Sequence, residues 1–110
     1  MNITTSTQND ISIFTLDGRV DSQGAIDLEN ALQEVSGEGK NHMLLDMSRV
    51  TYINSSGLRI LAAIVTQNQG SGGDLLLVTP TRKIQRVFQL IGFDNFIRMF
   101  DNVESAVQAF

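Results

Sequence analysis

At 110 residues, 42% of them hydrophobic and 18% charged, the chain has the length and composition of one globular domain, with no room for a second core. Its formal net charge of −4 has the wrong sign for binding a phosphate backbone, so no nucleic-acid partner is expected. Cysteine is absent, which excludes disulfides, thiol catalysis and thiolate metal sites. No apolar stretch approaches the roughly 20 residues of a spanning helix, and the first residues lack the features of a signal peptide. We therefore expect a cytoplasmic protein without membrane contact.

One small group of basic residues departs from the acidic composition. Arg82, Lys83 and Arg86 fall at the start of a segment with helical periodicity. Three charges at the start of an amphipathic helix are more typical of a face in contact with water than of a lipid or nucleic-acid binding surface. We interpret this cluster as a solvated face.

The first third of the chain predicts a hairpin followed by a helix. Apolar residues occupy both phases of the alternation over 11–16, which predicts a strand covered on both faces, and the weaker segment 2–7 is expected to pair with it through Asn9-Asp10. Ser22 is expected to cap a helix that ends at Gly37. The apolar positions of this helix recur at steps of three and four residues: Ala25, Leu28, Leu32 and Val35.

The middle of the chain predicts two buried strands with a helix between them. Residues 43–47 and 75–78 are short apolar runs bounded by turn signals, which is typical of central strands. A helix from about Ser56 carries apolar residues on most of its circumference and ends in the glycine-rich segment 70–73. We expect it to be the most buried helix of the molecule.

The last third predicts two more helices and a final strand. Residues 79–81 mark a loop that ends in a helix cap, and an apolar stripe over 84–91 is closed by Gly92. A similar stripe over 103–110 follows the cap signal Asp101-Asn102, and the segment 96–100 between the two stripes predicts a strand. The full order implies parallel crossover units after an opening hairpin. We predict an α/β fold in which four helices pack on a mixed sheet of about five strands, as a single domain over 1–110.

Enzymatic motifs are missing from the sequence. It contains no glycine-rich dinucleotide or phosphate loop and no nucleophile elbow. His42 is the only histidine and stands just before a buried strand, where a surface or edge position is the ordinary interpretation. The carboxylates follow no metal-loop pattern. We expect no catalytic residues, no metal and no cofactor.

Two adjacent serines stand where the strand near 43–47 gives way to the second helix. In the plainer interpretation, Asn54, Ser55 and Ser56 satisfy the free N–H groups of the helix start, and Gly57 allows a tight turn. In the functional interpretation, the same N–H groups and the positive end of the helix dipole can hold a phosphate on a serine. The residues alone leave both interpretations open.

The segment 45–58, Leu-Asp-Met-Ser-Arg-Val-Thr-Tyr-Ile-Asn-Ser-Ser-Gly-Leu, resembles the signature of bacterial anti-sigma factor antagonists, which are STAS domains. Gly18-Arg19-Val20-Asp21 resembles the early turn of that family, and 73–78 with 84–93 resembles its C-terminal half. The resemblance therefore covers 11–110 and is most specific at the serines. It implies a STAS-type α/β fold.

The resemblance also implies a site. The phosphorylated serine of the family maps to Ser55, with Ser56 in the neighbouring small-residue position. Asp21 matches an acidic residue near the switch serine, although a turn or cap role beside Ser22 explains it equally well. Asn54 stands where the best-known members have Asp, and Arg59 where they have a second Gly. Arg59 is expected either to pair with the phosphate or to face solvent.

What the resemblance implies about function is a switch in partner binding. The unmodified domain is expected to bind an anti-sigma factor that is also a serine kinase of the GHKL type, through Asp21, Asn54, Ser56, Gly57 and Arg59, and so to release the sigma factor. Phosphorylation of Ser55 is expected to end binding, and a metal-dependent serine phosphatase to restore it. Two alternatives are a STAS scaffold in a larger signalling or transport complex, with Ser55 unmodified, and nucleotide hydrolysis at the start of the second helix.

Overall fold

The computed structural model describes all residues, 1–110. Its centre is one mixed sheet in the order β1-β2-β3-β4-β5, in which β1 is antiparallel to β2 and every other neighbouring pair is parallel. The strands are β1 (Asn2–Gln8), β2 (Ile11–Val20), β3 (His42–Ile53), β4 (Asp74–Val78) and β5 (Met99–Phe100). Parallel neighbours require crossover connections, and helices supply them.

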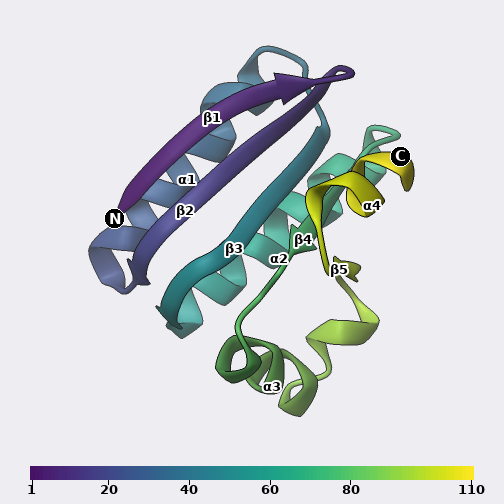
Figure 1. The fold of residues 1–110 in the computed structure, drawn as a ribbon. Coiled ribbons are helices and arrows are strands. Elements are labelled where there is room, and N and C mark those ends of the chain that lie inside the picture. The colour runs from purple at the N-terminus through teal and green to yellow at the C-terminus, as the bar shows by residue number, and fades with distance from the viewer.

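Four helices and one 3-10 turn surround this sheet (Figure 1). They are α1 (Ser22–Gly37), α2 (Ser55–Gly70), α3 (Arg82–Leu90), η1 (Phe93–Asn95) and α4 (Val103–Gln108). Side chains of α1, α2 and α3 share one core cluster of 20 buried residues, whereas α4 packs on the opposite side of the sheet over a cluster of six. The predicted α/β architecture, with five strands in a mixed sheet and four helices, is confirmed.

The hairpin between β1 and β2 closes where the sequence predicts it. Asn9 and Asp10 have φ values of 53° and 63°, the left-handed pair that a two-residue hairpin turn requires. Gln8 is therefore paired directly with Ile11. Both phases of the alternation in β2 are buried near its start, as expected for a strand covered on two faces.

The two central strands are longer than the sequence predicts. β2 continues to Val20 and β3 to Ile53, and their parallel register shifts twice, between Thr15 and Asp17 and again between Gly18 and Arg19. At each shift β3 contributes one more residue than β2, which is a bulge. Bulges interrupt the alternation of side chains, so the second half of β3 carries no clear strand pattern in the sequence.

Two further expectations were wrong, and a third holds only narrowly. Asp21, not Ser22, is the N-cap of α1, because its carboxylate accepts the hydrogen bond from the N–H of Gly24. The last strand comprises only Met99–Phe100; Phe96 follows the 3-10 turn and is 41% exposed. Helix α2 buries five residues, the same number as α1, and leaves seven residues exposed against eight in α1, so it is the most buried helix only by a small margin.

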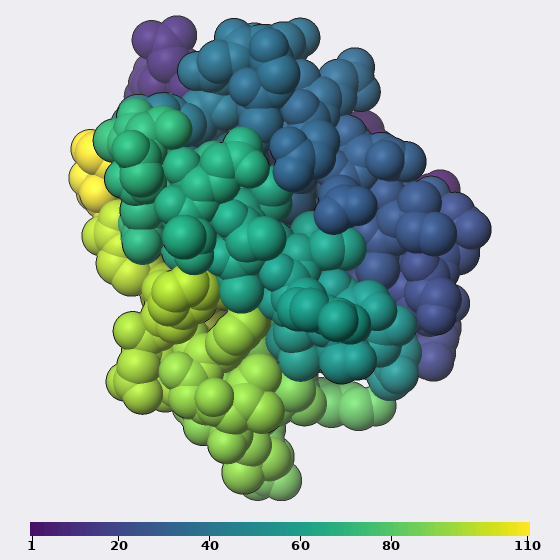
Figure 2. Space-filling view, turned by 180° about the vertical axis from the view of Figure 1, so that it is seen from behind, coloured from purple at the N-terminus to yellow at the C-terminus, as the bar shows by residue number.

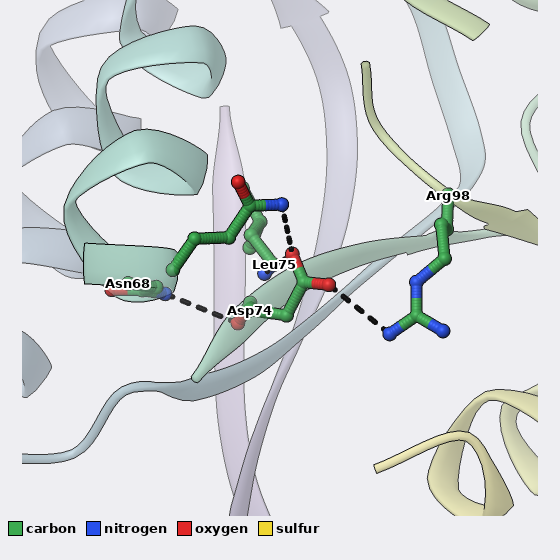
Figure 3. Close-up of polar contacts among 5 residues, drawn as sticks. Asn68, Asp74, Leu75 and Arg98 are labelled. Atoms are coloured by element: carbon green, nitrogen blue, oxygen red, sulfur yellow. Dashed lines mark hydrogen bonds and ion pairs between the residues drawn. The ribbon is translucent and has the colours of Figure 1, made fainter. Parts of the chain in front are cut away.

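A polar cluster fixes the amino end of β4 (Figure 3). One oxygen of the Asp74 carboxylate accepts hydrogen bonds from Leu75 N–H at 2.8 Å and from the Gln69 amide at 3.3 Å, and the other pairs with Arg98 at 3.1 Å. The buried Asn68 amide donates to the Asp74 carbonyl at 3.2 Å. These bonds connect the end of α2 to β4 and to the segment before β5. The cluster lies at the end of the sheet remote from the two serines.

None of the helices combines the length and the apolar character needed to cross a bilayer.

Candidate functional site

The junction of β3 and α2 is held by hydrogen bonds of Asn54. Asn54 is the N-cap of α2, and its side-chain oxygen accepts from Gly57 N–H at 2.9 Å. The backbone N–H of Asn54 donates to the Val20 carbonyl at the end of β2, also at 2.9 Å. The capping role expected for Asn54 is confirmed, and these bonds position the first turn of the helix relative to both central strands.

The two serines differ in their surroundings. Ser55 is exposed and its hydroxyl forms no hydrogen bond within the chain, whereas Ser56 is half-buried. Ser56 lines a shallow hollow of about 410 Å³ together with Glu29, Arg59, Ile60 and Ala63, between α1 and α2. The hydroxyl of Ser55 therefore faces solvent at the first position of the helix, and that of Ser56 lies partly covered at the second.

The first turn of α2 also keeps unused hydrogen-bond donors. The backbone N–H groups of Ser55 and Ser56 bond to no other group of the chain. Together with the helix dipole they make the start of α2 electropositive and favourable for an anion on a neighbouring oxygen. An added phosphate at this position would meet donors and a partial positive charge.

Gly57 is required for packing rather than for the tight turn that the sequence indicated. A Cβ at this position would lie 2.6 Å from Cγ1 of Val20 and 2.9 Å from Cγ1 of Ile53, well inside contact distance. Gly57 itself is buried in the first turn of α2 and has no positive φ. The glycine lets the helix start approach the ends of β2 and β3 closely.

Asp21 lies at the same edge of the sheet as the serines. Val20 is paired with Ile53, so Asp21 and Asn54 each follow the last residue of a neighbouring parallel strand. Asp21 accepts from Gly24 N–H at 2.9 Å and is exposed. The structure thus gives Asp21 the cap role and places it on the strand next to the serine junction. Arg59 is exposed on α2 and forms no ion pair.

One pair of residues at this end of the sheet was missed by the sequence analysis, Arg19 and Tyr52. The Arg19 guanidinium lies 4.4 Å from the centre of the Tyr52 ring, a cation–π contact between β2 and β3. Each residue immediately precedes the final buried residue of its strand, so matching the ends of the two strands would have predicted the contact. The contact lies at the carboxyl ends of β2 and β3, two residues before Asp21 and Asn54.

No arrangement for catalysis accompanies the serines. His42 bonds to Asn41 at 2.8 Å and packs against Phe110 at the amino end of β3. Because β3 runs from His42 to Ile53, the imidazole lies at the opposite end of that strand from the serines and cannot act as their base. No three His, Cys, Asp or Glu side chains are grouped to hold a metal.

Comparison with known proteins identifies the family. The STAS domain model matches residues 2–106, and the chain belongs to the STAS domain family. It is 30% identical over 110 residues to BtrV of Bordetella bronchiseptica, provisionally named an anti-sigma factor antagonist, covering 100% of this chain and 95% of BtrV. The chain thus falls among the anti-sigma factor antagonists of that family.

Solved structures of anti-sigma factor antagonists have the same fold as this chain. A crystal structure of an anti-sigma factor antagonist from Mycobacterium paratuberculosis superposes with a TM-score of 0.84 at 25% identity, over 98% of this chain and 92% of the other. SpoIIAA of Bacillus in its phosphorylated form superposes with a TM-score of 0.77 at 16% identity, over 98% of both chains. At the latter identity the likeness concerns the fold.

Proposed function

We propose that this chain is an anti-sigma factor antagonist whose binding is switched by phosphorylation of Ser55. In the unmodified state it binds an anti-sigma factor that is also a serine kinase of the GHKL type, and the sigma factor is released. Phosphorylation of Ser55 ends the binding, and a metal-dependent serine phosphatase restores it. The cytoplasm, where sigma factors act, is the proposed location.

The observation that carries the proposal is the exposed, unbonded hydroxyl of Ser55 at the first position of α2. A kinase needs a hydroxyl that reaches solvent, and Ser56 is half-buried beside Arg59 and Ile60. The names of the relatives support an anti-sigma factor as the partner, and a member of the same fold is known in a phosphorylated form. Among the two serines, Ser55 fits this role better.

The physical step is the addition of charge to an otherwise unchanged domain. A phosphoserine carries about −1.5 to −2 charges at neutral pH. Because the start of α2 is electropositive, the charge is tolerated inside the domain. In a complex it faces the partner, where an unfavourable charge costs several kcal/mol, and each 1.4 kcal/mol is about tenfold in affinity. We expect phosphorylation to weaken binding about a hundredfold or more.

The test compares four baits: wild type, Ser55→Ala, Ser55→Asp and the matched control Ser56→Ala. Incubation with the candidate kinase and ATP should add one phosphate, measured by intact mass, to wild type and Ser56→Ala only. Titration calorimetry should show tight binding of the kinase by wild type and Ser55→Ala and its loss with Ser55→Asp; Ser56→Ala serves as the control for phosphate transfer. Equal binding by all four without phosphate transfer would refute the switch and favour a STAS scaffold in a larger complex.

A further inference from the structure

Helix α3 is positively charged in an acidic protein. It carries Arg82, Lys83 and Arg86 and no acidic residue. Because the whole chain has a net charge of −4, the remainder carries −7. No acidic residue occurs anywhere between Asp74 and Asp94, so the positive region extends beyond the helix itself.

These basic side chains are not used within the fold. All three are exposed, and none takes part in any of the four ion pairs of the structure. The helix is held to the core by its opposite face, where Ile84 and Phe88 are fully buried. Stability of the domain therefore gives no reason for three cations on one short helix.

Apolar side chains continue the same surface toward solvent. Leu90 is 80% exposed at the end of α3, Ile91 follows at 52%, and Phe96 after the 3-10 turn is 41% exposed. Only two other large hydrophobic residues of the chain are exposed to a comparable degree, so three of the five gather here. Figure 2 shows this segment as a green and yellow-green lobe that protrudes below α2.

The lobe lies at the end of the sheet where Ser55 is found. β3 and β4 are parallel neighbours, and α2 and α3 leave from their carboxyl ends, with Asn54 and Thr81 as the respective caps. Figure 1 places α3 beyond the same end of the sheet at which β3 ends. One partner surface can therefore span both Ser55 and α3.

We infer that the outer face of α3 docks on an acidic, partly apolar surface of the anti-sigma factor partner. This α3 surface consists of Arg82, Lys83, Arg86 and Leu90, which line one shallow hollow, and of Ile91, which follows them. The inference rests on the proposed function and names the partner chemistry that the function leaves open. Unpaired cations beside exposed leucine and isoleucine are complementary to carboxylates around an apolar patch.

The charge of the rest of the molecule favours a protein over other polyanions. A membrane or a nucleic acid presents negative charge over a wide area, which would repel the −7 carried outside α3. A protein surface can confine its carboxylates to the contact. A partner that is acidic where it faces this end of the sheet would also be repelled by a phosphate on Ser55, because the phosphate adds negative charge at the same end of the domain.

The two lysines of the chain supply a matched pair of variants. Lys83 lies on the α3 surface, and Lys40 is exposed in the turn after α1, where it pairs only with Glu38. Lys83→Glu and Lys40→Glu change the net charge equally. Against the purified anti-sigma factor, Lys83→Glu should weaken binding about three- to tenfold and make the affinity less dependent on salt. Lys40→Glu should weaken binding by less than about twofold. Leu90→Ser, at an exposed position, should weaken binding at all salt concentrations.

A zero-length cross-link locates the contact directly. Carbodiimide treatment of the complex should join Lys83 to an Asp or Glu of the partner, identified by peptide mass spectrometry, and Lys83→Arg should remove that product. Cross-linking through Lys40 alone, or wild-type affinity of Lys83→Glu, would overturn the inference. So would Lys83-dependent binding to anionic vesicles with unchanged partner binding.

The outcomes separate this inference from the proposed switch. If Ser55→Asp loses the partner and Lys83→Glu keeps it, the switch stands and the α3 surface is not the contact. If Lys83→Glu weakens binding and Ser55→Asp does not, the contact stands and the switch is wrong.

Discussion

Gly57→Ala tests the close approach of α2 to the central strands. The added methyl group would lie 2.6 Å from Val20 Cγ1 and 2.9 Å from Ile53 Cγ1. Both side chains are β-branched and buried, so neither can rotate away freely. Overpacking of this kind costs about 1–3 kcal/mol, and the better helix propensity of alanine returns at most about 1 kcal/mol. We expect the free energy of unfolding to fall by about 1–2 kcal/mol.

Gly70→Ala is the matched control, because it makes the same change in the same helix. No atom lies within 4 Å of a Cβ at Gly70, so only the helix propensity should act. Urea unfolding should show this variant unchanged or up to about 1 kcal/mol more stable. In thermal unfolding the two variants should differ by roughly 4 °C per kcal/mol. Equal urea midpoints for the two variants would refute the packing argument.

Three other predictions follow from the hydrogen bonds and the exposed serine. Asn54→Ala should cost about 1 kcal/mol of stability through loss of the cap, whereas Asn54→Asp should retain it, a contrast measurable by urea unfolding. Asp74→Ala should cost about 1–3 kcal/mol because three donors lose their acceptor, whereas the exposed, unbonded Asp94→Ala should change stability by less than about 0.5 kcal/mol. Phosphorylation of Ser55 should leave the far-UV circular dichroism unchanged; partial unfolding would contradict a switch confined to the surface.

The sequence predicts most of the fold because each element carries its own local signal. The hairpin was predicted from Asn9-Asp10, and Asn54, together with Ser55 and Ser56, was expected to satisfy the free N–H groups at the start of α2. Local signals also failed in identifiable ways. Phe96 is of a residue type common in strands, but it follows the 3-10 turn and is exposed. The bulges of β3 interrupt the alternation of buried and exposed residues, so the second half of that strand was not predicted.

Contacts between segments that are distant in the sequence could not be predicted from local signals. That Gly57 faces Val20, 37 positions earlier, depends on the parallel pairing of β2 with β3. The cluster Arg82, Lys83 and Arg86 was interpreted from the sequence as a solvated face, and the structure agrees that it is exposed. What the sequence lacked was the position of α3 beyond the same end of the sheet at which β3 ends. That Ser55 is phosphorylated stays a prediction.

Three helices begin after the carboxyl ends of the parallel strands β2, β3 and β4, and their N-caps are Asp21, Asn54 and Thr81. The positive potential at their starts comes from backbone amides, and no substitution of a surface side chain can remove it. Surface residues near these helix starts, Arg59 among them, can therefore change during evolution while the start of α2 stays favourable for an anion.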